Sequence, residues 1–173
     1  FKGLGCKVKS LFSKPDGKFP NHIPDPHKLE TLRILQKEVK NFRANLGLAY
    51  DGDGDRVGAI DEKGNYVGMD FLLMMMARDA LARAKSEKRK AKNKFKVVVD
   101  VRASQAFLDD ITAHGGTPSM VRVGRSFIIT ETLKRKAVFG GEFTGHMFFP
   151  NQYFNFDDGM YASVKIAEAV SLC

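Results

Sequence analysis

Helix-like and strand-like segments alternate along nearly the whole chain, and this alternation constrains the fold more than any other feature of the sequence. Apolar spacing of three and four residues, together with capping residues, predicts helices, at residues 25–42, 70–84, 104–116, 125–136 and 158–172. Short runs rich in β-branched and aromatic residues predict strands, at residues 46–50, 57–67 (a hairpin), 95–101, 119–124 and 137–142. Such alternation is typical of helices layered on a sheet. The sequence therefore predicts an α/β fold of two layered units with mixed, partly parallel sheets.

The pattern restarts near Asp70, which we take to mark the start of a second domain. Residues 1–68 then form the first domain and residues 69–173 the second. The first domain is expected to be incomplete, because residues 3–12 read as the end of a helix running into a strand and the chain begins with Phe rather than Met. An incomplete sheet would leave an exposed apolar edge.

Two helix starts are assigned from capping residues. Asp25 is expected to cap the first long helix, with Pro26 in its first turn, and Asp70 is expected to cap the next. The apolar residues of these two helices are expected to face the core; they are Leu29, Leu32, Leu35, Val39 and Phe42 in the first helix and residues 71–77 in the second.

Composition and charge limit the classes of function. The 173 residues carry a net charge of +8, much of it in residues 83–96. This basic run lacks interleaved aromatic side chains, which argues for a solvated connection and against a nucleic-acid surface, although a polyanion-binding module stays an alternative. The longest apolar run, residues 71–77, is too short to span a bilayer, so no membrane partner is expected. With only Cys6 and Cys173, no disulfide framework or cysteine zinc site is expected, and a reducing cytoplasm fits.

Three aspartates alternate with glycines between two of the expected strands, in the stretch DGDGDR. Asp51, Asp53 and Asp55 would fill positions 1, 3 and 5 of an EF-hand calcium loop. Glu62 would fill position 12, but position 6, which requires glycine, is Arg56, and the flanking segments read as strands instead of helices. The EF-hand reading is therefore disfavoured, while a polar turn whose aspartates cap backbone N–H groups stays open.

The same loop suits a hard divalent cation. Mg²⁺ binds a few carboxylates and completes its shell with water or substrate phosphate, and Asp51, Asp53 and Asp55 offer three carboxylates on one tight loop. Arg56 follows directly, and a guanidinium beside a metal can clamp a phosphate. The loop is therefore a candidate Mg²⁺ site for a phosphoryl group in transfer.

A second candidate site lies in the stretch FGGEFTGHMFF. Glu142, Thr144 and His146 alternate there and would point to one side of an extended segment. A carboxylate, a hydroxyl and an imidazole on one side suit a polyol, and His146 could also move a proton near neutral pH. The alternative is a glycine-rich strand end whose histidine is satisfied locally.

A third candidate is Arg125 in the stretch VRVGRSF. It follows Gly124 at an expected strand-to-helix junction, where backbone N–H groups favour anions. Taken alone, a solvated arginine fits this position equally well.

Two of these stretches resemble one family closely. LGLAYDGDGDRVGAIDEKGNYV resembles the metal loop of the α-D-phosphohexomutases, and GGEFTGHMFFPNQYFNFDDGMYAS resembles their sugar-binding loop. The ending FNFDDGMYAS and the stretch FPNHIPDP are similar to the phosphomannomutase/phosphoglucomutase branch, and the resemblance covers essentially the whole chain. A fragment of a phosphoglucosamine mutase stays the alternative within the family.

The resemblance implies a Mg²⁺-dependent enzyme of four domains. Such an enzyme moves phosphate between the 1 and 6 positions of a hexose phosphate, glucose or mannose, through a phosphoserine and a hexose 1,6-bisphosphate. The implied roles are metal binding for Asp51, Asp53 and Asp55, contact with the transferring phosphate for Arg56, hydroxyl binding for Glu142 and Thr144, and proton transfer for His146.

The chain departs from the family's pattern at three positions. Thr144 stands where the family commonly has Ser, and it keeps the hydroxyl. Arg102, in the stretch DVRAS, stands where the family has Lys, and Arg125 stands where it has His. Because arginine keeps a positive contact but does not readily give up a proton, both positions are expected to bind phosphate or hydroxyl groups of the substrate.

The family's serine loop and terminal phosphate loop do not occur in this sequence. We therefore expect the chain to hold the later part of the family's domain 2 together with domain 3. Its expected partners are a hexose phosphate and the missing domains 1 and 4 of the same protein. Without the catalytic serine, the chain alone is expected to be inactive.

Overall fold

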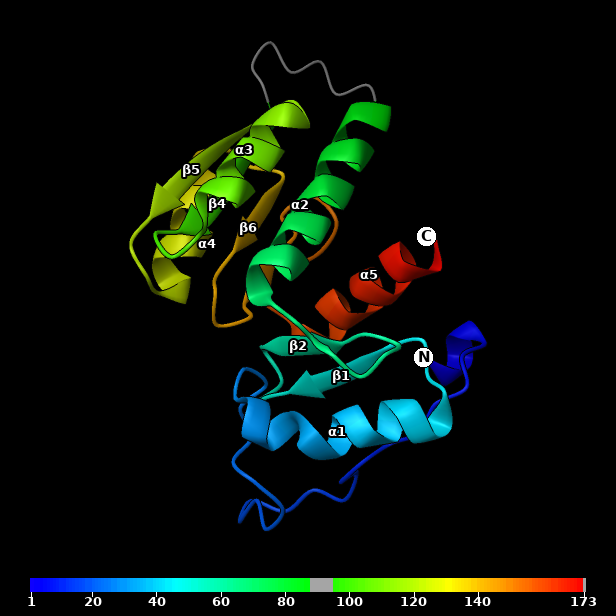
Figure 1. Ribbon diagram of the computed structural model, residues 1–173. Helices are drawn as coiled ribbons and strands as arrows, with labels where there is room; N and C mark the ends of the chain where they lie inside the picture. Colours follow the sequence, from blue (N-terminus) through cyan, green and yellow to red (C-terminus); the bar gives the residue numbers. More distant parts are fainter. Residues whose placement is uncertain (88–94, 173) are drawn as a thin grey trace.

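The structure, a computed structural model, describes residues 1–87 and 95–172 (Figure 1). It contains two β-sheets, each with helices packed on it. Residues 88–94, which belong to the predicted basic run at residues 83–96, lie outside the described residues. None of the helices in the described ranges combines the length and the apolarity needed to cross a bilayer.

The first sheet consists of β1 (Gly47–Tyr50), β2 (Val57–Ile60) and β3 (Tyr66–Val67), in that spatial order. All of its strand pairs are antiparallel. Helix α1 (Leu29–Phe42) covers one face, with Leu32 and Val39 buried. Because Tyr50 pairs with Val57, the aspartate stretch between them forms the turn of the β1–β2 hairpin.

The second sheet consists of β5 (Gly116–Val121), β4 (Phe95–Asp100), β6 (Phe139–Gly141) and β7 (Met147–Phe148), in that spatial order. β4 runs parallel to β5 and β6, whereas β7 is antiparallel to β6. Helices α2 (Met69–Ser86) and α3 (Gln105–Ala113) cover one face, and α4 (Arg125–Lys134) covers the other. Because β4 lies between two helix layers, its consecutive valines 97–99 are all fully buried.

Helix α5 (Gly159–Ser171) lies between the two sheets (Figure 1). Its residues Ala162 and Ile166 belong to the same core cluster as Val57 and Ala59 of β2 and all of the buried residues of α2. The hydrophobic core therefore continues from one sheet to the other, and a domain boundary between residues 68 and 69 stays a prediction. The shared core holds the β1–β2 turn beside the loops that follow β4 and β6.

The predicted α/β class with a partly parallel sheet is confirmed, and mixed strand directions occur only in the second sheet. The strand predicted at residues 119–124 begins at Gly116 instead, because Gly115, with a φ of 75°, turns the chain directly out of α3. Residues 3–12 do not form the predicted helix end and strand. They contain only part of a 3-10 turn, Lys2–Leu4, and pair with no strand of the described chain.

Two predicted helix caps are wrong. The carboxylate of Asp25 accepts the N–H of His27 at 3.0 Å, which fixes a turn before the helix, so α1 begins only at Leu29. Asp70 lies inside α2, and its carboxylate accepts hydrogen bonds from the backbone N–H and the hydroxyl of Ser104. It therefore ties the start of α2 to the start of α3.

The predicted apolar stripes are only partly buried. In α1, Leu29 and Phe42 are 57% and 44% exposed, because they lie at the two ends of a helix that is longer than the strands it covers. In α2, Phe71 is 69% exposed and does not face the core. The core-facing side of the helix is formed by the buried residues Leu72, Leu73, Met76 and Ala77.

Candidate functional site

The turn at residues 51–56 is tied together by its own first residue. Asp51 Oδ1 accepts hydrogen bonds from the backbone N–H groups of Gly54 and Arg56, both at 3.1 Å. Asp51 Oδ2 accepts a hydrogen bond from Arg56 Nε at 2.5 Å. The guanidinium that was predicted to face a phosphate thus also pairs with the first aspartate of its own loop.

The three predicted metal ligands come together. Asp51, Asp53 and Asp55 each offer a carboxylate oxygen, and these oxygens lie within 4.8 Å of one another. Burial raises the pKa of Asp55, and the neighbouring carboxylates raise it further, although the nearby His146 opposes them. Burial acts in the same direction on Asp51, but there the hydrogen bonds from Arg56 outweigh it and lower the pKa. A cluster of hard oxygen donors with mutual repulsion fits a divalent cation such as Mg²⁺.

The N-terminus of α5 packs against this turn. Asp158, where the last helix was predicted to begin, caps that helix, and its Oδ1 accepts hydrogen bonds from Met160 N at 2.8 Å and Tyr161 N at 3.0 Å. The backbone N–H of Gly159 donates to Gly54 O at 3.0 Å. A Cβ on Gly159 would lie 2.6 Å from that same oxygen, so only glycine fits between the helix and the turn.

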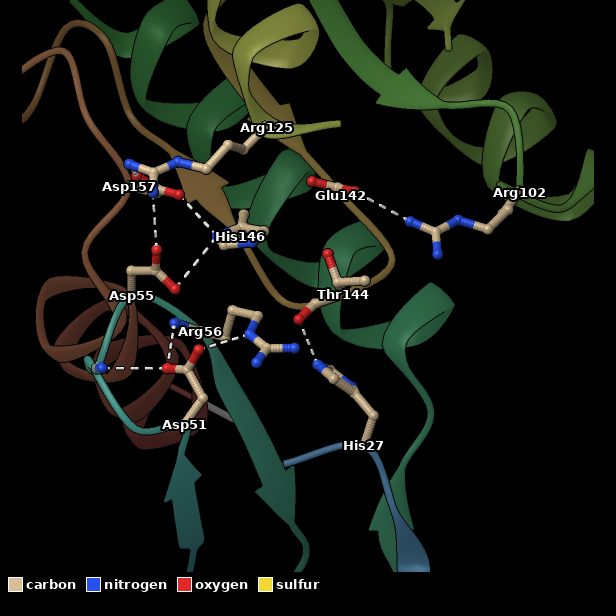
Figure 2. Close-up of polar contacts among 11 residues, drawn as sticks. His27, Asp51, Asp55, Arg56, Arg102, Arg125, Glu142, Thr144, His146 and Asp157 are labelled. Atoms are coloured by element: carbon tan, nitrogen blue, oxygen red, sulfur yellow. Dashed lines mark hydrogen bonds and ion pairs between the residues drawn. The ribbon is translucent and has the colours of Figure 1, made fainter. Parts of the chain in front are cut away.

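A second cluster joins the aspartate turn to the rest of the site (Figure 2). Arg125 Nη1 lies 3.1 Å from Asp55 Oδ2, and its Nη2 lies 2.9 Å from Asp157 Oδ1. His146 Nδ1 lies 2.6 Å from Asp157 Oδ2 and 3.5 Å from Asp55 Oδ1. Burial alone would raise the pKa of Asp157, but His146 and Arg125 outweigh it and hold the pKa below its usual value.

The predicted extended segment that carries Glu142, Thr144 and His146 is instead a tight turn between β6 and β7. Glu142 N donates to His146 O, and Gly145 N donates to Glu142 O, both at 2.9 Å. The reversal follows from the pairing of β6 with β7, and Gly145 takes a φ of 95° to complete it. Despite this correction, the turn lies beside the aspartate turn (Figure 2), and His146 and Arg125 share the partners Asp55 and Asp157.

Arg102 supports this turn from the end of β4. Its Nε and Nη2 bind the two carboxylate oxygens of Asp100, at 3.0 and 2.8 Å, and Nη2 also lies 3.3 Å from Glu142 Oε1. Asp100 is fully buried and also accepts the N–H of Phe143 at 2.7 Å. Burial would raise the pKa of Asp100, but these hydrogen bonds lower it. Arg102 is therefore engaged by two carboxylates and fixes Glu142 in place.

His27 supports the same turn from the other side. Its Nε2 hydrogen-bonds to the backbone oxygen of Thr144, and its Nδ1 lies 3.2 Å from Tyr66 Oη. The hydroxyl of Thr144 is buried and has no hydrogen-bond partner among residues 1–87 and 95–172. Burial lowers the pKa of His27, which favours its neutral ring.

The structure thus gathers the predicted residues into one site, and it adds supports that the sequence reading missed. Asp157 stands next to Asp158 in the stretch FDDG, and a single aspartate is enough for a helix cap, so the second one was a usable signal. Asp100 lies within the strand predicted at residues 95–101, and no feature of the sequence marks it as a support of the site. His27 gave no signal, because its partners Tyr66 and Thr144 lie 39 and 117 positions away.

Comparisons with known proteins agree on one family. The family model described as "Phosphoglucomutase/phosphomannomutase, alpha/beta/alpha domain III" matches residues 69–172, and the corresponding model of domain II matches residues 1–64. A phosphomannomutase/phosphoglucomutase of Pseudomonas syringae pv. tomato is 44% identical over 98% of the chain, and a phosphoglucomutase of Neisseria gonorrhoeae is 42% identical over 99%. The chain spans 35% of the length of each of these relatives.

One solved structure resembles the whole chain. A phosphoglucomutase/phosphomannomutase family protein of Burkholderia thailandensis superimposes with a TM-score of 0.90 and 32% identity. The match covers 99% of this chain and 36% of that protein. The two sheets and their helices therefore follow the overall arrangement seen in that structure.

Proposed function

The chain belongs to the phosphoglucomutase/phosphomannomutase family, and we propose that it forms the metal-binding and sugar-binding part of a phosphohexomutase. The proposed reaction is the reversible, Mg²⁺-dependent transfer of phosphate between the 1 and 6 positions of a hexose phosphate. A phosphoserine outside this chain and a hexose 1,6-bisphosphate intermediate complete the proposal. A cytoplasmic location belongs to it as well, since Cys6 is a free thiol.

The observation that carries the proposal is the contact between the aspartate turn and the Glu142–His146 turn. His146 Nδ1 lies 3.5 Å from Asp55 Oδ1, and Arg125 bridges the same Asp55 to Asp157. Groups suited to a metal and a phosphate thus lie directly beside groups suited to sugar hydroxyls. Phosphoryl transfer depends on such positioning, because the protein supplies mainly orientation and electrostatic stabilisation.

The donor set fits Mg²⁺. Asp51, Asp53 and Asp55 provide oxygen ligands only, close enough together to share one ion, and they leave further positions for a phosphate oxygen or water. When bound there, Mg²⁺ would neutralise charge on the phosphate oxygens during transfer. The second group able to hold a metal, Asp55, His146 and Asp157, already contains the guanidinium of Arg125 and is not proposed as a metal site.

The remaining residues have distinct proposed roles. Arg56 and Arg125 neutralise phosphate oxygens, and Arg56 lies nearest the metal ligands. Glu142 accepts hydrogen bonds from ring hydroxyls, and the hydroxyl of Thr144 both donates hydrogen bonds to them and accepts hydrogen bonds from them. Because Asp157 engages Nδ1 of His146, the other ring nitrogen of His146 is the one able to exchange a proton with a substrate hydroxyl.

Arg102 is proposed to bind a hydroxyl or phosphate group of the substrate while it holds Glu142. Its guanidinium already contacts Asp100 and Glu142, which fixes both the plane of the guanidinium and the position of the carboxylate. A fixed donor and a fixed acceptor side by side would select the orientation of a bound sugar.

The test uses the full-length protein that contains this chain. We expect turnover of glucose 1-phosphate or mannose 1-phosphate with Mg²⁺ and a bisphosphate primer, and no turnover from residues 1–173 alone. Turnover of glucosamine 1-phosphate but of neither hexose phosphate would support the phosphoglucosamine mutase alternative. Salt-sensitive polyanion binding without any turnover would support the module that uses the basic run at residues 83–96.

A further inference from the structure

The Glu142–His146 turn is the part of the site that carries the proposed sugar ligands, and one residue from the first sheet's unit reaches into it. His27 precedes α1, and its imidazole hydrogen-bonds to the main-chain oxygen of Thr144. We propose that His27 is a positioning residue for the sugar site, which it acts on by holding Thr144. This proposal rests on the proposed function of the same turn.

The hydrogen bonds of His27 define a single state of its ring. A carbonyl oxygen can only accept, so Nε2 must carry a proton and donate it to Thr144. In the neutral ring Nδ1 is then an acceptor, and the hydroxyl of Tyr66 at 3.2 Å is its donor. Burial and the nearby guanidinium of Arg56 both lower the pKa of His27, which favours this neutral ring. The result is a chain of two hydrogen bonds from β3 to the sugar-binding turn.

The packing around His27 shows that the turn is fitted to its ring. A Cβ on Gly145 would lie 2.8 Å from Nε2 of His27 and 3.0 Å from the backbone oxygen of Val57. Gly145 also has a φ of 95°, which other residues rarely adopt. The turn therefore rests directly on the imidazole and on the start of β2, and a change in either one moves it.

The hydrogen bond from His27 fixes the backbone of Thr144 itself, and thereby the direction of its side chain. Figure 2 shows the carbonyl oxygen of Thr144 directed at His27, with the hydroxyl on the opposite side, toward Glu142. That hydroxyl is buried and has no partner in the described part of the chain. A buried hydroxyl without a partner is costly, so a ring hydroxyl of the substrate would supply the missing hydrogen bond. If the carbonyl is released, the hydroxyl loses its fixed direction.

Two substitutions separate positioning from simple loss of packing. His27→Gln places an amide nitrogen near the position of Nε2, so it can still donate to Thr144. His27→Asn is one bond shorter, so its amide does not reach. In the full-length protein we expect His27→Asn to raise the KM for glucose 1-phosphate about tenfold with a smaller change in kcat, as the loss of one hydrogen bond predicts. His27→Gln is expected to stay within about threefold of the unaltered protein.

A direct readout of the turn does not depend on turnover. Hydrogen exchange of the backbone amides of residues 140–149 is expected to be faster in His27→Asn than in His27→Gln. His22→Asn is the matched control, because His22 lies in the same connecting segment and, within the described residues, its ring hydrogen-bonds to Ile23 O and packs against the ring of Phe12. It is expected to leave both the KM and the exchange unchanged.

The outcomes separate this inference from the proposed function. If the unaltered full-length protein shows no turnover, the proposed function fails, and hydrogen exchange alone decides about His27. An unchanged KM and unchanged exchange in His27→Asn would overturn the inference, and so would equal losses in the Asn and Gln variants. If His27→Asn does not fold, Tyr66→Phe replaces it: a rise in KM of about threefold supports the inference, and no change overturns it.

Discussion

The two turns of the candidate site are held in opposite ways. The turn at residues 51–56 is held largely by its first residue, Asp51, whose partners lie three and five positions along the chain. The turn at residues 142–146 has two backbone hydrogen bonds of its own, but its side-chain supports come from outside, from Arg102, 40 positions from its partner, and from His27, 117 positions from its partner. One turn is therefore built by local sequence, and the other by the meeting of distant segments.

This difference distinguishes residues that supply a chemical group to the site from residues that only hold such groups in place. Local contacts form with the β1–β2 hairpin itself, because closing a short loop costs little conformational entropy. Of the supports of the second turn, His27 reaches it only after both sheets have come together on the shared core, whereas Arg102 reaches it from the end of the neighbouring strand β4. Changes within the first turn are therefore expected to remove a chemical function, whereas changes around the second are expected to move groups that stay present.

The largest effect is expected from Asp53→Asn, which tests the chemistry of the local turn. Asp53 is exposed, so its replacement is expected to leave the fold intact and to remove the negative charge of one proposed metal ligand. We expect turnover of the full-length protein to fall by about 10²–10³-fold, with a raised Mg²⁺ requirement. Glu62→Gln, an exposed carboxylate just beyond β2, is the control. Equal Mg²⁺ dependence in both variants would show that the turn is not the metal site.

Asp157→Asn is expected to have the next largest effect, because it breaks the non-local cluster. Asp157 is buried and pairs with both Arg125 and His146, so neutralising it leaves two groups without their partner. We expect kcat/KM of the full-length protein to fall about 10²-fold. Asp109→Asn, on the exposed side of α3, serves as the comparison and is expected to change nothing. Similar kinetics in both variants would remove Asp157 from the site.

Gly159→Ala sharpens the comparison, because it tests whether the turn at residues 51–56 also depends on its contact with α5. The new Cβ would lie 2.6 Å from Gly54 O and 2.9 Å from Arg56 O, both backbone atoms that cannot swing away. We expect the free energy of unfolding to fall by about 2 kcal/mol, measured by denaturant titration. Gly17→Ala meets no atom within 4 Å and is the control. Unchanged stability in Gly159→Ala would mean that α5 does not constrain the turn.

The smallest effect is expected in the pH dependence of the support at His27. Its pKa is lowered in the folded protein, mainly by burial, so between the folded value and the unfolded value of about 6.5 the unfolded chain binds more protons. The stability that His27 contributes is therefore present above pH ~6.5 and declines as the pH falls through the folded value. We expect the difference in melting temperature between the unaltered protein and His27→Gln to shrink as the pH is lowered through this range. A difference that stays constant with pH would contradict the lowered pKa.

Several elements of the fold could be predicted, and the reason is local. The strands at residues 46–50 and 95–101 and the start of the last helix at Asp158 depend on side-chain type and spacing, so they were placed within a residue or two. The caps at Asp25 and Asp70 failed, because the carboxylate of Asp25 serves the turn before α1 and that of Asp70 binds Ser104. A carboxylate near a helix start can cap that helix or bind elsewhere, and only the packing decides which.

The sequence by itself determined the chemical inventory of the site: three aspartates on one turn, the arginines, and the alternating Glu142, Thr144 and His146. Residue type and short spacing are enough for that, because they fix which ligands and hydrogen bonds are available. The tertiary structure alone decided that residues 142–146 form a turn instead of an extended strand. It also decided that Asp157 and His27 hold that turn, because contacts across 11 and 117 positions exist only once the shared core has brought the segments together.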